Sequence, residues 1–177
     1  MILEQRESTA VRILIDGYNL LFQSQLVGRG RGPHWLKAAR QRLIGHLSSR
    51  LTPELASQTR IVFDASQGIE PTHDETLPSG MQIVFANDHS EADDLLEELI
   101  RRHHAPKSLT VVSSDMRVRR CARARRAISL DSETFLDRLH AGSFGIEVVV
   151  DEQSVGDDSP TMTDEQVNFW LREFGDF

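Results

Sequence analysis

The stretch that most constrains this chain is the largely apolar run Val11–Ile15, which stops abruptly at Asp16. The run shows no alternation of polar and apolar residues. Such a continuous apolar run is typical of a strand that is buried on both faces in a parallel sheet. Gly17 follows the acid and allows the backbone or a ligand to approach closely. Ligands of open α/β sheets usually bind at the carboxyl ends of the strands. The run therefore predicts a central parallel strand that ends in an acid at the functional edge.

Similar apolar runs recur along the chain and alternate with segments of helical periodicity. We expect strands over residues 60–63, 81–86, 109–112 and 127–130, and an edge strand over 146–150. Helices are predicted over 20–26 and 35–51, from Ser90 onward, after Asp115, and from Asp131 or Ser132 through His140. Residues 65–80 are expected to form a long polar loop. This alternation predicts an α/β fold with a mainly parallel sheet.

The length of 177 residues suits one domain with its own core, which we place at residues 1–150. An acidic linker is predicted over 151–162, followed over 163–175 by an amphipathic helix packed on the domain. The single cysteine excludes an internal disulfide framework, and the apolar runs are too short to span a membrane. Because the first ten residues are polar and carry no signal-peptide core, we expect a cytoplasmic protein with no membrane partner.

The formal net charge of −7 is unevenly distributed, because residues 151–177 hold eight acids and one arginine. Residues 1–150 are balanced, and local clustering decides whether a phosphate backbone can bind. A polyanion is predicted to contact the arginine-rich helix after Asp115 and the glycine-rich loop 28–33; a solvated helix face is the alternative for each arginine. The candidates are Arg117, Arg119, Arg120, Arg123, Arg126, Arg29 and Arg31. Weak base readout is expected, since few aromatic residues are present and Tyr18, Phe22 and Trp35 are interpreted as buried.

Acids gather at one predicted edge of the sheet. Asp16, Asp64 and Asp115 each follow an apolar strand, and Asp93 and Asp94 stand in the first turn of a helix that leaves the same edge. Close carboxylates raise one another's pKa unless a cation neutralises them. Carboxylates without a Cys or His cluster suit Mg²⁺ or Mn²⁺, which can polarise a phosphoryl oxygen and generate hydroxide. The alternatives are that Asp64 caps a loop, that Asp93 or Asp94 only complements the helix dipole, and that Ser113 and Ser114 form a turn or hold a water.

Four motifs, in order along the chain, resemble the NYN domains of the PIN-like nuclease superfamily, and most closely their YacP-like branch. They are I-D-G-Y-N at 15–19, V-F-D-A at 62–65, E-A-D-D at 91–94 and S-S-D at 113–115. The resemblance implies a PIN-like three-layer α/β/α sandwich whose mainly parallel sheet has about five strands. It also implies a metal-dependent endoribonuclease with Mg²⁺ or Mn²⁺ at Asp16, Asp93 and Asp115, supported by Asn19 and by Asp64 or Asp94. The branch further implies messenger RNA as substrate and the ribosome as a partner.

One departure from the family is visible, because Arg125, Arg126 and Ala127 stand where the family often has glycine before the fifth strand. We expect this change to alter RNA contacts more than catalysis. A non-catalytic RNA- or ribosome-binding adaptor and a PIN-type toxin are open alternatives. An aspartyl-phosphate phosphohydrolase is disfavoured, because it needs a second acid where Tyr18 stands. A receiver domain is disfavoured because it needs paired acids before or at Asp16. The sequence does not indicate the oligomeric state.

Overall fold

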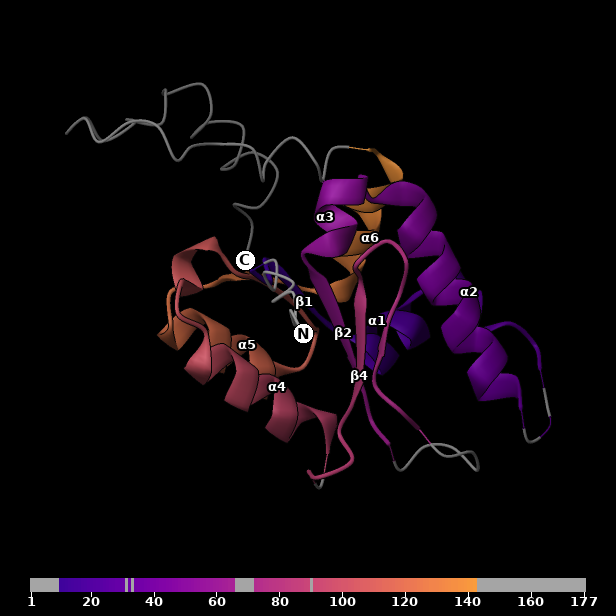
Figure 1. Cartoon of the computed structure of the whole chain (residues 1–177), viewed down its shortest axis with the longest axis horizontal. Coiled ribbons are helices and arrows are strands. Elements are labelled where there is room, and N and C mark those ends of the chain that lie inside the picture. Colours follow the sequence, from indigo (N-terminus) through magenta and orange to yellow (C-terminus); the bar gives the residue numbers. More distant parts are fainter. Residues whose placement is uncertain (1–9, 31, 33, 66–71, 90, 143–177) are drawn as a thin grey trace, which may run out of the picture.

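The structure is a computed structural model that describes residues 10–142 except 31, 33, 66–71 and 90 (Figure 1). Its centre is a six-stranded sheet with the strand order β3-β4-β2-β1-β5-β6. The strands are β1 (Ile13–Asp16), β2 (Thr59–Phe63), β3 (Glu75–Thr76), β4 (Gln82–Phe85), β5 (Thr110–Val112) and β6 (Ile128–Leu130). All neighbouring strands pair in parallel except β3, which is antiparallel to β4. The predicted buried parallel strand is thus β1, flanked by β2 and β5.

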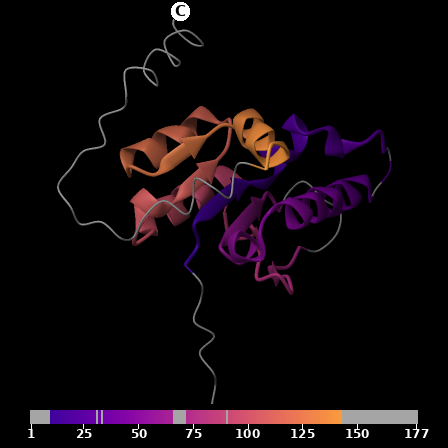
Figure 2. The ribbon, with the colours of Figure 1, turned by 90° about the horizontal axis from the view of Figure 1, so that it is seen from above.

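Helices cover both faces of this sheet. They are α1 (Gly17–Gln23), α2 (Trp35–Arg50), α3 (Pro53–Ser57), α4 (Ala92–Arg102), α5 (Met116–Ala124) and α6 (Ser132–His140), with 3₁₀ turns at Gln25–Val27 and Pro106–Ser108. Ile13 and Ile15 of β1 pack in a cluster with α1, α2 and α6, whereas Leu14 packs with α4 and α5. Figures 1 and 2 show α4 and α5 on one side of the sheet and α2 on the other. The fold is therefore the expected α/β/α sandwich.

Several boundaries differ from the sequence-based expectations. The described part of the sheet has six strands, because Glu75–Thr76 inside the predicted loop 65–80 pair with β4. The helix predicted over 20–26 already begins at Gly17, because the Asp16 carboxylate accepts a hydrogen bond from the backbone amide of Asn19. Helix α3 was missed since its five residues are too few to show a helical period. Ser90, the strand 146–150, the linker 151–162 and the helix 163–175 fall outside the described residues.

None of the described helices combines the length and the apolar composition that are needed to cross a bilayer.

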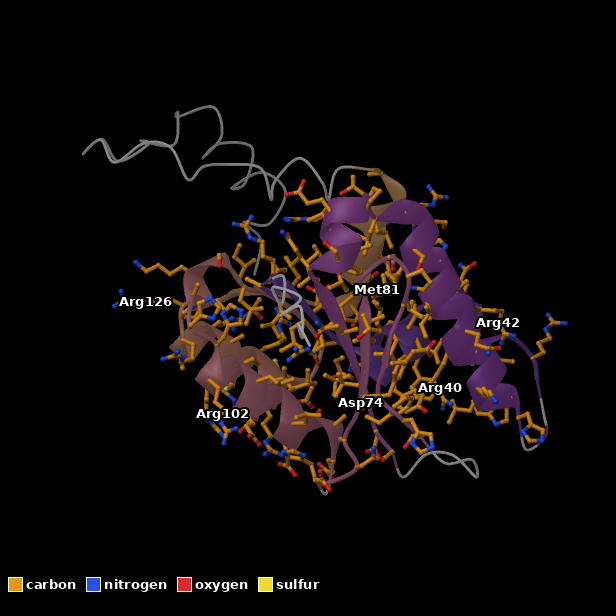
Figure 3. All side chains as sticks on the ribbon, viewed as in Figure 1. Arg40, Arg42, Asp74, Met81, Arg102 and Arg126 are labelled. Carbon is orange, nitrogen blue, oxygen red and sulfur yellow. The ribbon has the colours of Figure 1, made fainter. Side chains whose placement is uncertain are left out.

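The end of α5 shows why glycine would suit the position that Arg126 occupies. This residue has a φ of 62°, the left-handed region that favours glycine. The backbone amide of Ala127 donates to the carbonyl of Ala122, and that of Arg126 donates to the carbonyl of Arg123. This pair of bonds is the Schellman motif, in which glycine is the usual residue at the left-handed position. Figure 3 shows Arg126 at the margin of the molecule, so a strained backbone carries an exposed cation.

Replacing Arg126 by glycine is expected to raise the free energy of unfolding by about 0.5–1 kcal/mol, because it relieves the left-handed strain. Arg126→Ala removes the same charge but keeps a Cβ, so its stability should stay close to that of the wild type. Urea unfolding of the two variants measures this difference. Equal stability of Arg126→Gly and Arg126→Ala would show that the backbone at this position carries no strain.

Candidate active site at the carboxyl edge of the sheet

The carboxyl ends of β1, β4 and β5 deliver three acids to one edge of the sheet. Asp16 is the last residue of β1 and lies level with Val62 of β2. Asp93 stands in the first turn of α4, which follows β4. Asp115 follows β5 and caps α5, since its side chain accepts from the backbone amides of Arg117 and Val118. The parallel topology thus gives these segments a common edge.

Asp16 is the buried member of this group, with only 6% of its surface exposed. Its two carboxylate oxygens accept from the Asn19 amide at 3.2 Å and from the Ser113 hydroxyl at 2.8 Å. Burial raises the pKa of Asp16 to about 6, against the lowering effect of both hydrogen bonds. Asp93 and Asp115 raise this pKa further by charge repulsion. The buried carboxyl therefore has neutral hydrogen-bond partners and two acidic neighbours.

Ser113 links Asp16 to Asp115 through hydrogen bonds, and Asp93 interacts with both acids through its charge. The Ser113 hydroxyl is fully buried, donates to Asp16 and accepts from the Asp115 amide at 3.0 Å. It therefore fixes the ends of β1 and β5 relative to each other. Burial raises the pKa of the half-buried Asp93, and repulsion from Asp115 raises it further. The structure thus brings Asp16, Asp93 and Asp115 into electrostatic contact.

Asp94 and Arg117 have other partners. An Nη atom of Arg117 lies 2.5 Å from Asp94 Oδ1, and its Nε lies 2.6 Å from Oε1 of the buried Glu97. Asp94 is also absent from the acids that raise the pKa of Asp16. Because the guanidinium joins α5 to α4, Arg117 is positioned to hold Asp93 and Asp115 near each other, and its contact with RNA stays a prediction. Sequence periodicity could not reveal this pairing, since it joins residues of two helices.

Asp64 and Asn19 have interactions that the motifs did not reveal, and their supporting roles at the acidic edge stay predictions. Asp64 follows β2 and raises the pKa of Tyr18, after the larger effect of burial on that phenol. It is not among the groups that shift the pKa of Asp16. The Asn19 side-chain oxygen accepts from the Ser114 amide at 2.8 Å and from the Ser132 hydroxyl at 2.7 Å. Asn19 therefore ties α1 to β5 and α6, a position that its place in the motif did not reveal.

The other predicted RNA contacts lie along α5 and in the glycine-rich loop. Arg120, Arg123, Arg126 and Arg29 are exposed, and Arg31 falls outside the described residues. Arg119, one turn beyond Asp115, is half-buried, and its Nε has no hydrogen-bond partner in the described part of the chain. Phe22 is 51% exposed rather than buried, whereas Tyr18 is buried and Trp35 is partly buried. The cationic surface thus begins one helical turn from the acids.

Gly17 permits a close approach between the start of α1 and the end of β2. A Cβ at this position would overlap the Phe63 ring and lie 2.8 Å from the carbonyl oxygen of Val62. The first turn of α1 therefore sits directly on the end of β2, which places the Asp16 cap and Asn19 at the edge. Of the two alternatives expected at this glycine, the structure shows the close approach of the backbone, between α1 and β2.

The side chains at this edge offer the type of ligand atom that a hard divalent cation needs, because Mg²⁺ and Mn²⁺ prefer carboxylate oxygens. The fit has a physical basis in Asp16, whose pKa is raised first by burial and then by repulsion from Asp93 and Asp115, so that a nearby positive charge would stabilise its carboxylate. Within the described residues, however, no three His, Cys, Asp or Glu side chains form a ready-made metal site. This edge therefore carries suitable ligand atoms, but the described side chains are not already arranged around a single metal position.

Comparison with known proteins places this geometry in a family. The sequence pattern of the YacP-like NYN domain matches residues 13–168. No curated protein sequence matches the chain. The crystal structure of Rae1 (YacP) from Bacillus subtilis is similar with a TM-score of 0.55 at 19% identity, covering 91% of this chain and 82% of that one. A crystal structure of a tryptophan-to-leucine mutant of the same Bacillus subtilis protein gives a TM-score of 0.54 at 18% identity, covering 76% of this chain and 78% of that one.

At these identities the solved structures show the fold, and the family match covers most of the chain. The match begins at β1 and extends through the four motifs at the carboxyl edge. The expected PIN-like architecture is therefore confirmed. This chain belongs to the YacP-like NYN domain family, a nuclease-like family.

Proposed function

We propose that this protein is a divalent-cation-dependent endoribonuclease, with Asp16, Asp93 and Asp115 holding Mg²⁺ or Mn²⁺. The observation that carries the proposal is Asp16, an acid 6% exposed whose hydrogen-bond partners are neutral and whose acidic neighbours help to raise its pKa to about 6. Keeping such a group costs stability, so it calls for a compensating ligand. A bound cation would polarise a phosphoryl oxygen and activate water for attack on the phosphodiester.

The chain's own residues supply positioning for this reaction. Ser113 holds the Asp16 carboxylate and the Asp115 backbone in one arrangement, and the Arg117 ion pairs fix α4 beside α5. Arg119 offers a buried Nε–H one turn from Asp115, and Arg120 and Arg123 follow on the exposed surface. Guanidinium groups in this position suit a phosphate backbone that passes the acids. We propose messenger RNA as the substrate, either free or presented by the ribosome.

A second candidate is a non-catalytic RNA-binding adaptor on the same fold. It is favoured by one observation, namely that the acids of the described region do not form a ready-made group of metal ligands. Such a protein would bind RNA equally well with and without divalent cations. Substitution of its acids would leave its function intact.

The test measures cleavage of a labelled single-stranded RNA, and of messenger RNA on translating ribosomes, with Mn²⁺, Mg²⁺ or EDTA. We expect cation-dependent cleavage that Asp115→Asn reduces by roughly 10²-fold or more. Asp137→Asn, which changes an exposed acid on α6, is the matched control and should cleave normally. Thermal unfolding gives a second readout, because Mn²⁺ should stabilise the wild type more than Asp115→Asn. Cation-independent RNA binding without cleavage on either substrate would favour the adaptor.

A further inference from the structure

A pocket of about 260 Å³ lies on the opposite face of the sheet from α4 and α5, between α2 and the end of β4. Lys37, Arg40 and Gln41 line it from α2, Phe85 lines it from β4, and His73 and Glu75 line it from the segment before β4. Figure 3 shows Arg40 directed from α2 toward the end of β4. The three acids of the proposed metal site do not line this pocket, and neither does the arginine-rich helix α5. The proposed reaction therefore gives the pocket no role.

Arg40 is held in place within this pocket. It is only 9% exposed, and its Nη1 donates to the Tyr18 hydroxyl at 2.7 Å. The guanidinium carbon lies 5.9 Å from the centre of the Phe63 ring and 5.4 Å from that of Phe85. The two rings stack with centroids 5.8 Å apart. The pocket therefore presents a fixed planar cation and an adjoining aromatic ring, with less side-chain entropy to lose on binding.

The wall opposite α2 is fixed as well. The Asp74 carboxylate accepts from the Phe85 backbone amide at 2.9 Å, and the Thr72 hydroxyl donates to the Asn87 side chain at 2.8 Å. These bonds hold residues 72–75 beside the end of β4. Because both walls are held by specific hydrogen bonds, the pocket is a built feature of the fold.

The strand register relates the pocket to the acids. Asp16 is level with Val62, and Val62 is level with Val84, so Phe85 stands one residue beyond that level on β4. Strand β4 is two strands from β1, which corresponds to roughly 10 Å. Tyr18, the partner of Arg40, is two residues beyond Asp16 in the first turn of α1. A single RNA strand that crosses the carboxyl edge of the sheet could place one phosphate beside the three acids of the proposed metal site and a nearby base in the pocket.

The chemistry of the lining selects among ligands. Nucleobases stack on aromatic rings and on guanidinium planes, and this stacking tolerates any base. Lys37 and Arg40 of the lining face Glu75 and the neighbouring Asp74 carboxylate, so the charges of these described residues balance and suit a neutral planar ligand such as a base. The volume is below the range usual for drug-sized ligands and suits one base. An apolar peptide side chain would instead have to bury itself beside two cations.

We propose that this pocket binds a single nucleobase of the RNA, about two nucleotides or fewer from the phosphate at the acids. The inference rests on the proposed RNA substrate and adds a subsite on the opposite face of the sheet. It assigns Phe85 and Arg40 as the stacking partners of the base. Base stacking would then be stronger than the sequence-based expectation, which considered only Tyr18, Phe22 and Trp35.

The test measures binding of the full chain to short single-stranded RNAs in EDTA, so that it does not depend on cleavage. An abasic nucleotide is scanned along the RNA, and loss of the stacked base should weaken binding roughly 5- to 150-fold at one or two positions. Phe85→Leu should erase this position dependence, while Phe85→Tyr should keep it. Phe22→Leu, the same change on an exposed ring of α1, is the matched control and should also keep it.

Fluorescence of 2-aminopurine placed at the same positions gives a readout on the wild type that needs no variant. Quenching is expected at the positions that the abasic scan identifies. Uniform abasic penalties, a position dependence that survives in Phe85→Leu, or no RNA binding at all would overturn the subsite. Saturable binding of free mononucleotides without any position dependence in RNA would assign the pocket to a small ligand instead. Failure of cleavage with a position-specific penalty would overturn the nuclease and leave the subsite standing.

Discussion

Asp16→Asn is expected to reduce RNA cleavage by roughly 10³-fold or more and at the same time to stabilise the protein. The loss of activity follows if Asp16 is a ligand of the cation, because an amide is a far weaker ligand than a carboxylate. The gain in stability follows from burial, which raises the pKa of this carboxyl from 3.8 to about 6. Asparagine retains an oxygen for the Asn19 backbone amide and carries no charge to bury, although its NH₂ group cannot accept from the Ser113 hydroxyl, which reduces the gain. Activity and stability should therefore change in opposite directions.

The sign of the pH dependence follows from the same shift. The folded protein binds the Asp16 proton more tightly than the unfolded chain, so its stability falls as the pH rises from about 4 to about 6. At pH 7 the cost corresponds to about 3 kcal/mol, which is the upper limit of the gain in Asp16→Asn. The variant should lack the contribution of this group to the pH dependence. Below about pH 4 the two proteins should have similar stability.

Urea unfolding in EDTA at about pH 4 and about pH 7 measures this effect, with Asp137→Asn as a control for the loss of an exposed acid. Adding Mn²⁺ at the higher pH should stabilise the wild type and leave Asp16→Asn nearly unchanged. If Asp16→Asn is no more stable than the wild type at the higher pH, the buried charge is already compensated within the protein. If it also cleaves RNA normally, Asp16 has no part in the reaction.

The parts of the fold that the sequence predicted correctly are those with a strong local signal. The buried strand that ends at Asp16 shows a continuous apolar run, and the long helix from Trp35 shows apolar residues at helical spacing. The two-residue strand β3 exists only because it pairs with β4, and α3 has too few residues for a period. Long apolar or amphipathic segments can thus be predicted from their own residues, whereas short elements depend on partners that are distant in sequence.

The site shows the same division. Strand ends placed Asp16 and Asp115 at one edge, because a parallel sheet aligns its carboxyl termini. The pairing of Arg117 with Asp94 and Glu97 was missed because it requires the packing of α4 against α5. The stacking of Arg40 on Phe63 and Phe85 was missed for a similar reason, since it joins a helix to two strands. Sequence order identifies the chemical groups, but tertiary packing decides which of them remain available to a ligand.

Asn19→Ala is expected to lower the free energy of unfolding by about 2–4 kcal/mol, because it leaves two donors without an acceptor. These donors are the backbone amide of Ser114 and the hydroxyl of Ser132, and the Ser132 side chain is fully buried. Ser132 also donates its own backbone amide to the Ser114 hydroxyl at 3.1 Å. Asn19 is therefore the acceptor at the centre of a small network that joins α1, β5 and α6.

Asn19→Asp is the matched control, because it keeps an acceptor oxygen for both donors. It should lose less stability than Asn19→Ala, and the remaining loss should come from one more negative charge near Asp16. Urea unfolding and RNA cleavage, measured on both variants, separate a structural role from contact with substrate. A structural Asn19 predicts that Asn19→Ala loses stability and cleavage together, and that Asn19→Asp with Mn²⁺ recovers much of both. Unchanged stability in Asn19→Ala with loss of cleavage would instead give its side chain a direct part in the reaction, in line with the supporting role at the metal that the family resemblance implies.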